Sequence, residues 1–294
     1  MGFDLQCSRF VFAAKQAGVD FSDTLTLGRQ NIHISERAYR TEAKRFGLPL
    51  DEGALSRAFS GFPYVDGMLT ELGAKAPLSM DASDYEGASY LADLNKPVST
   101  EFTGKFSAII DAGTIEHIFN FPQAVLNVAA MLKVGGHLIS VNGANNFTGH
   151  GFYQFSPELF YRVFAPENGF VVESMVLSEC NDDAEWYEVA DPAEVRQRVT
   201  LINNARTYLM MRARKTENVE MFRKTPQQSD YEDQNWVQPE KAGDMSYLRR
   251  PLKQRLAEQF LPRSGRTVMR RLSQATRRHF ASPHLVRSRM HFDD

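Results

Sequence analysis

The chain has 294 residues, of which 43% are hydrophobic and 24% are charged, and these values are typical of a globular protein. A formal net charge of −2 argues against a protein that lives wholly on nucleic acid, and we expect no nucleic-acid partner. The charge is uneven: the segment from Ser246 to the end holds 12 Lys and Arg against 3 acids, which leaves 22 basic and 33 acidic residues in the remainder.

The first ten residues lack a basic stretch that leads into an apolar core, as a secretory signal would have. The sequence also lacks a run of about 18 apolar residues that could cross a membrane. We therefore expect a soluble cytoplasmic protein.

The first part of the chain predicts short helices and strands in alternation. Residues 1–22 form a predicted N-terminal helical segment that packs on the body. Residues 23–28 alternate and are β-branched before a glycine, which predicts a first buried strand. Ser35 is typical of a helix N-cap, and the pattern predicts a helix from there toward Arg45. A further short helix is predicted over residues 51–59.

Two weak apolar runs, residues 77–80 and 89–91, predict short strands that lead into Asp81 and Asp93. The run 106–110 is too short for a helix and leads into Asp111, as a buried parallel strand does. Three strands that each lead into a carboxylate predict a common polar edge of the sheet.

After residue 110 the sequence predicts a strand, a crossover helix and a parallel strand. Pro122 suits the first turn of a helix, and apolar residues recur at helical spacing as far as Leu132. Gly135 and Gly136 are predicted to stop this helix before a new strand at residues 138–141.

The sequence beyond this unit predicts one more helix and the last two strands of the sheet. Ser156 and Pro157 are an N-cap followed by a first-turn proline, and strands are predicted at residues 170–177 and 207–215. The composition then becomes polar to about residue 243, which is typical of a linker, and basic after it. We predict domains at 1–22, 23–215 and 216–294.

The order of these elements, with M-L-K-V-G-G at residues 131–136 and a last strand at 207–215, resembles the class I S-adenosylmethionine-dependent methyltransferases. The resemblance covers roughly residues 23 to 215. It implies a Rossmann-like α/β fold with a seven-stranded sheet, mostly parallel with an antiparallel last strand, followed here by a basic C-terminal extension. It also implies S-adenosyl-L-methionine as the cofactor.

This chain departs from the pattern of that family in the first motif. The family places several glycines after its first strand and an acidic residue two positions before the first glycine. This chain keeps Gly28 alone and has Thr26 at the acidic position. Arg29 offers a positive charge there, to meet the carboxylate of the cofactor or an acidic substrate.

The resemblance assigns the cofactor site to the ends of the strands. Asp81 is the residue chosen for the ribose diol, with Asp84 as its competitor, and Asp93 with Leu94 is chosen for the adenine. Asp111 and Gly113 would lie near the methyl donor. The alternative for each aspartate is a solvated turn residue, because Asp is common in turns. The cofactor-binding set is therefore Gly28, Arg29, Asp81, Asp93, Leu94, Asp111 and Gly113.

Proton transfer is assigned to Glu116, His117 and His150. An imidazole titrates near neutrality, so either histidine could accept a proton from the acceptor, and Glu116 could orient it. The alternatives are a carboxylate at a helix start for Glu116 and a loop histidine bonded to backbone for His150. A metal site formed by these three residues is conceivable, but no two of them have the spacing of metal ligands on one helix face, so we expect none.

The sequence favours methyl transfer to a small or glycan-like polar acceptor. The first competing function is a catalytically silent methyltransferase-like binding or scaffolding protein. Its basic tail, with Arg270 and Arg271 among apolar residues, would contact an anionic membrane, although such a run is more often a solvated face. A third function, an enzyme acting on nucleotide sugars, lacks a G-x-G-x-x-G motif.

Overall fold

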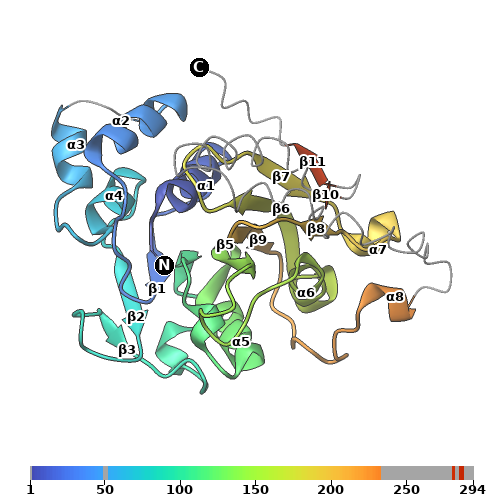
Figure 1. Cartoon of the computed structure of the whole chain (residues 1–294). Helices are drawn as coiled ribbons and strands as arrows, with labels where there is room; N and C mark the ends of the chain where they lie inside the picture. Colours follow the sequence, from blue (N-terminus) through green and yellow to red (C-terminus); the bar gives the residue numbers. More distant parts are fainter. Residues whose placement is uncertain (1, 49–51, 233–279, 282–284, 288–294) are drawn as a thin grey trace, which may run out of the picture.

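The computed structural model describes residues 2–48, 52–232, 280–281 and 285–287, and within them nine strands form one twisted sheet (Figure 1). The order across the sheet is β3-β2-β1-β4-β5-β9-β6-β7-β11. These strands are β1 (Thr24–Leu27), β2 (Leu78–Asp81), β3 (Tyr90–Leu91), β4 (Phe106–Asp111), β5 (Leu132–Asn145), β6 (Phe170–Glu179), β7 (Trp186–Val189), β9 (Thr207–Lys215) and β11 (Leu285–Arg287).

The half of the sheet from β3 to β5 is parallel throughout. Strand β9 inserts antiparallel between β5 and β6, as the predicted last strand of the methyltransferase-like domain should. The structure thus confirms the Rossmann-like sheet with a parallel core and antiparallel strands toward the C-terminus. It has nine strands where seven were predicted, because β7 and β11 extend its edge beyond β6.

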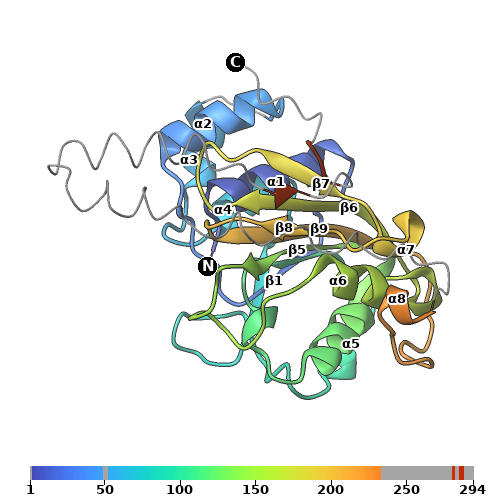
Figure 2. The ribbon, with the colours of Figure 1, turned by 45° about the vertical axis from the view of Figure 1, so that its right-hand side comes forward.

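Helices cover both faces of the sheet. Figure 2 shows α1 to α4 on one side and α5 and α6 on the other. Alternate residues of a strand serve the two cores, so Ile110 packs with the first group of helices and Ile109 with the second. The helices are α1 (Leu5–Gln16), α2 (Glu36–Arg45), α3 (Glu52–Ala58), α4 (Asp66–Glu71), α5 (Phe121–Met131), α6 (Pro157–Val163), α7 (Pro192–Val195) and α8 (Ser229–Glu232), with 3₁₀ turns η1 (Thr100–Phe102), η2 (Ile115–His117) and η3 (Pro166–Asn168).

The predicted helix caps are present. The Ser35 hydroxyl accepts the N–H of Ala38 at the start of α2, and the Ser156 hydroxyl accepts that of Leu159 at the start of α6. Pro157 occupies the first turn of α6. These local signals place both helices where the sequence predicts them.

The end of α5 differs from the prediction. The helix stops at Met131, and Leu132 already pairs with Phe106 as the first residue of β5. Gly135 and Gly136 therefore do not end the helix; they lie in an irregular part of β5 between the pairs Phe106–Leu132 and Ala108–His137. Gly135 has φ +87°, a conformation that glycine adopts readily, and this allows the irregularity.

The insertion between β6 and β9 contains strand β7. Trp186 is 1% exposed, and its indole N–H donates to the Gln6 side chain of α1 at 2.7 Å. Burial of this ring therefore attaches the insertion to the N-terminal helix. The insertion also holds β8 (Leu201–Ile202), which pairs with β10 (Phe280–Ala281).

The segment after Lys215 contacts the body as far as Glu232. The Phe222 N–H donates to the Asn168 side chain at 3.0 Å, and the Ser229 hydroxyl donates to Glu158 at 2.6 Å. The basic residues Arg270 and Arg271 lie outside the described residues, and the domain boundary at residue 215 stays a prediction. No helix within the described ranges is long and apolar enough to cross a membrane.

Candidate functional site

The predicted polar edge lies at the carboxyl ends of the parallel strands. Neighbouring strands β1 and β4 continue in opposite directions across the sheet, toward β2 and β3 and toward β5, so the point between them is the switch point of the topology. Ligands of open α/β sheets bind in the crevice at such a point. Gly28 follows β1 here, and Asp111 ends β4.

Gly28 and Asp81 lie side by side at this edge. Gly28 has φ +73°, and a Cβ added to it would lie 2.8 Å from Thr114 Oγ1, so this position requires glycine. Its N–H donates to the carbonyl of Met80, and the N–H of Arg29 donates to Asp81 Oδ2 at 3.1 Å. The Asp81 carboxylate, which is partly exposed, also accepts the N–H of Ser83 and keeps lone pairs for a further donor.

The side chain of Arg29 points to a different partner from the predicted one. Its guanidinium donates to Asp66 of α4 at 2.7 Å and lies 4.3 Å from the centre of the Tyr64 ring. Thr26, at the position where the family has an acid, donates its hydroxyl to the carbonyl of Gly28 at 2.9 Å. Both side chains thus serve the structure of the first loop.

Two residues that the sequence reasoning missed, Gln30 and Thr114, lie at the switch point. The Gln30 amide donates to the carbonyl of Leu27 at 2.6 Å and lies 3.2 Å from the Thr114 hydroxyl, which donates to the same carbonyl at 2.7 Å. These contacts join the loops after β1 and β4, and Gln30 and Thr114 are 84 residues apart. Local sequence carries no signal for such a pair.

The predicted adenine residues divide between surface and core. The Asp93 side chain is 44% exposed, and hydrogen bonds from Asn95, together with Lys96, lower the pKa of its carboxyl. Leu94 is 6% exposed and packs in the core against α5, so its side chain is part of the hydrophobic interior. Asp84, the competitor of Asp81, is exposed.

Asp111 is fully buried and all its bonds are internal. Oδ1 accepts the N–H groups of Thr114 and Ile115, and Oδ2 accepts the Ser140 hydroxyl at 2.9 Å and the Asn142 amide at 2.6 Å. Burial raises the pKa of this carboxyl, although the four hydrogen bonds act against the rise. The carboxylate thus fixes the turn after β4 to β5. Gly113 has φ +89° in that turn.

The three predicted catalytic residues come together although His150 is 33 positions beyond His117. Glu116 Oε1 lies 3.4 Å from His150 Nε2 and 4.0 Å from His117 Nε2, and the two imidazole rings meet edge to face at 4.8 Å between centroids. The Glu116 side chain is 0% exposed, while those of His117 and His150 are 47% and 34% exposed. We call these residues the Glu-His-His cluster.

Burial controls the charge of the cluster. Desolvation, with the nearby Asp111 charge, raises the pKa of Glu116 to about 8, and desolvation lowers the pKa of both histidines. These shifts all oppose the charged forms, so burial disfavours an ion pair between Glu116 and His150.

The backbone of the loop after β5 holds Glu116 in place. The N–H groups of Phe152 and Tyr153 both donate to the Glu116 carbonyl, at 2.8 and 3.2 Å. Gly151 has φ +68°, and a Cβ added to it would lie 2.9 Å from both Glu116 Cγ and the Glu116 carbonyl oxygen. The close approach of the loop backbone to Glu116 thus occurs at Gly151, since a Cβ at Gly149 would meet nothing within 4 Å.

Substitution of Gly151 is expected to disturb this support. Gly151→Ala should lower the free energy of unfolding by about 1–3 kcal/mol, because it adds backbone strain to a steric conflict with Glu116. Gly149→Ala is the matched control and should change it by less than about 0.5 kcal/mol. Urea unfolding followed by circular dichroism measures both, and equal effects of the two changes would contradict the assigned contact.

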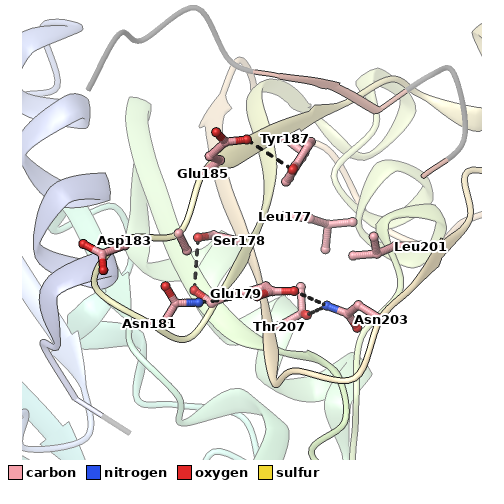
Figure 3. A pocket seen from close by; sticks show the side chains of 11 residues that line it. Leu177, Ser178, Glu179, Asn181, Asp183, Glu185, Tyr187, Leu201, Asn203 and Thr207 are labelled. Atoms are coloured by element: carbon pink, nitrogen blue, oxygen red, sulfur yellow. Dashed lines mark hydrogen bonds between the residues drawn. The ribbon is translucent and has the colours of Figure 1, made fainter. Parts of the chain in front are cut away.

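A pocket lined by both polar and apolar residues opens at the same edge of the sheet, next to the end of β6 and the start of β9 (Figure 3). Its volume is about 540 Å³. Asn203 on its wall donates to Glu179 and Thr207 and accepts the amide of Asn145, the last residue of β5 before the loop of His150. The polar lining residues are Ser178, Glu179, Asn181, Asp183, Glu185, Tyr187, Asn203 and Thr207. Asn142, near the end of β5, is fully buried and donates its amide to Asp111.

No family model matches the chain, and no curated protein sequence matches it. Methyltransferases are frequent among the solved structures that are similar to it. A 1,6-didemethyltoxoflavin N1-methyltransferase from Burkholderia thailandensis, with S-adenosylhomocysteine bound, has 10% identity and a TM-score of 0.40 over 72% of this chain and 79% of its own.

Two further solved structures show the range of activities. A branched-chain polyamine synthase from Thermus thermophilus, with 5′-methylthioadenosine bound, has 13% identity and a TM-score of 0.36 over 74% of this chain and 58% of its own. A 16S rRNA adenine N1-methyltransferase from Catenulisporales acidiphilia has 11% identity and a TM-score of 0.33 over 75% and 95%. At such low similarity, the fold class of the chain rests on its own strand order.

Proposed function

We propose that the protein is an S-adenosylmethionine-dependent methyltransferase that acts on a small or glycan-like polar acceptor. The observation that carries this function is the position of Asp81 beside Gly28 at the switch point of a sheet with methyltransferase strand order. A carboxylate there, partly exposed and next to a close backbone path, suits a ribose diol. S-Adenosylmethionine would supply an electrophilic methyl group.

The residues of the chain would bind the cofactor and orient the acceptor. Asp81 would accept the ribose hydroxyls, and the exposed Asp93 carboxylate would accept the adenine amine. The Glu-His-His cluster lies on the loops after β4 and β5, so it would lie on the acceptor side of the methyl group. Alignment of acceptor and methyl donor supplies much of the acceleration in such a displacement, which makes precise positioning the main task of the protein.

The pocket lining supports the proposed acceptor class. Carboxylates and amides line it, and the hydrogen bonds of Asn203 connect it to the loop that carries His150. Such groups pair well with hydroxyl groups, which both donate and accept. The lining therefore supports a hydroxyl-rich polar acceptor.

Titration of the full chain with S-adenosylhomocysteine, followed by calorimetry, tests the cofactor. We expect one site of micromolar affinity. Asp81→Ala should weaken it about 10- to 100-fold, because a hydrogen bond to a charged group contributes about 1.5–3 kcal/mol. The exposed Asp84→Ala is the control and should bind as the unchanged protein does. Absence of binding in the unchanged, folded protein would exclude the proposed cofactor.

One observation favours the catalytically silent alternative. Gln30 and Thr114 bond to each other at the switch point, and the Arg29 guanidinium is paired with Asp66. A protein that kept the sheet and lost the cofactor would tolerate these contacts between side chains at the switch point. The same titration separates the two functions, since a silent binding protein gives no heat with S-adenosylhomocysteine.

A further inference from the structure

We propose that the Glu-His-His cluster binds a divalent first-row transition metal ion, with Glu116, His117 and His150 as its three protein ligands. The cluster joins a carboxylate oxygen and two imidazole nitrogens whose ligand atoms all lie within 4.8 Å of one another. Two imidazoles and one carboxylate are a common ligand set for Zn²⁺, Fe²⁺ and related ions.

One of the ligand separations already fits such an ion, and the others are somewhat longer. Bonds of about 2.0–2.2 Å to zinc place neighbouring ligand atoms about 3.0–3.5 Å apart. The separation of Glu116 Oε1 and His150 Nε2, 3.4 Å, already meets this requirement. His117 Nε2 is 4.0 Å from the same oxygen, and its side chain is 47% exposed, so a small rotation of the ring completes the set.

Burial without hydrogen-bond partners points to a ligand independently of the distances. Among the described residues, neither oxygen of the fully buried Glu116 has a hydrogen-bond partner, and His150 Nε2 has none. Buried polar atoms without partners destabilise a fold, so their convergence on one point is unusual unless something binds there. A metal ion would engage Glu116 Oε1 and His150 Nε2 directly.

The chain holds the cluster in a fixed place. Both N–H groups that donate to the Glu116 carbonyl come from the loop of His150, and Gly151 packs directly on Glu116. The two ligand-bearing segments are thereby clamped together by backbone. A site on such a support is preorganised, as tight metal binding requires.

Three protein ligands leave coordination positions open, which is typical of catalytic metal sites. The histidines are partly exposed, so an oxygen of the acceptor can reach the ion from solvent. The ion would polarise that oxygen as a Lewis acid. This catalytic role rests on the proposed function, whereas metal binding does not.

The test uses the full chain after treatment with a chelator. Co²⁺ is titrated with visible absorption as the readout, because its spectrum reports nitrogen and oxygen ligation, and Zn²⁺ is titrated by calorimetry. We expect one ion bound per cluster and a higher unfolding temperature with the ion. Glu116→Gln and His150→Ala should each weaken binding by about 100-fold or more, since loss of a ligand exceeds the effect of a supporting residue.

His33→Ala is the control, because His33 is exposed and lies outside the cluster. It should leave the Co²⁺ spectrum unchanged. Binding that is absent, or equal in Glu116→Gln and the unchanged protein, would overturn the metal site. The titration with S-adenosylhomocysteine is run on the same samples, so a protein that binds the nucleotide and no metal keeps the proposed function and loses this inference.

Discussion

Replacement of Asp111 by alanine is expected to lower the free energy of unfolding by about 3–5 kcal/mol, the largest effect on stability among the site residues. The change removes an acceptor from four buried donors: two backbone N–H groups, the Ser140 hydroxyl and the Asn142 amide. Water cannot replace the carboxylate readily, because the site is 0% exposed.

Two further substitutions make this result specific. Asp111→Asn keeps one oxygen for the backbone donors, and once the Asn142 amide turns over, the new amide can donate to Asn142 Oδ1, which has no partner among the described residues. It should cost less, about 1–2 kcal/mol. The exposed Asp84→Ala should stay within about 0.5 kcal/mol of the unchanged protein. Urea unfolding followed by circular dichroism measures all three, and a small effect of Asp111→Ala would contradict the internal role of Asp111.

The sequence predicts most of the fold because its signals are local. Ser35 and the pair Ser156–Pro157 mark helix starts within one turn, and residues 106–110 identify a buried strand by their own composition. The predictions fail where contacts between residues distant in the sequence determine the structure. Leu132 is the first residue of β5 and pairs with Phe106 of β4. In β7, the Trp186 indole donates to Gln6, 180 positions away.

The prediction of the site also succeeds where it depends on local signals and fails where it depends on distant contacts. The carboxyl ends of parallel strands meet by topology, so the sequence correctly predicts that Gly28, Asp81 and Asp111 share one edge. Whether a side chain at that edge faces a ligand or the interior depends on partners elsewhere in the chain. Asp111 accepts the amide of Asn142 from β5, and the Arg29 guanidinium donates to Asp66. Their cofactor contacts, like the catalytic roles of Glu116, His117 and His150, stay predictions.

Replacement of Gly28 by valine is expected to reduce the affinity for S-adenosylhomocysteine by about 100-fold or more, to below detection, because strain of about 3 kcal/mol suffices for that factor. A Cβ at φ +73° would lie 2.8 Å from Thr114 Oγ1, so the loop after β1 must separate from the loop after β4. That movement also displaces the Arg29 N–H from Asp81, the carboxylate proposed for the ribose.

A second glycine separates the effect of contact from that of backbone strain. Gly104 also has positive φ, +59°, but a Cβ there would meet nothing within 4 Å, and the residue follows η1, away from the edge where the cofactor is proposed. Gly104→Ala should lower stability by about 1 kcal/mol and leave the nucleotide affinity unchanged. Calorimetric titration of the two folded variants decides the matter. If Gly28→Val bound S-adenosylhomocysteine as tightly as Gly104→Ala, the nucleotide would have to bind away from the switch point, and Asp81 would lose its assigned role.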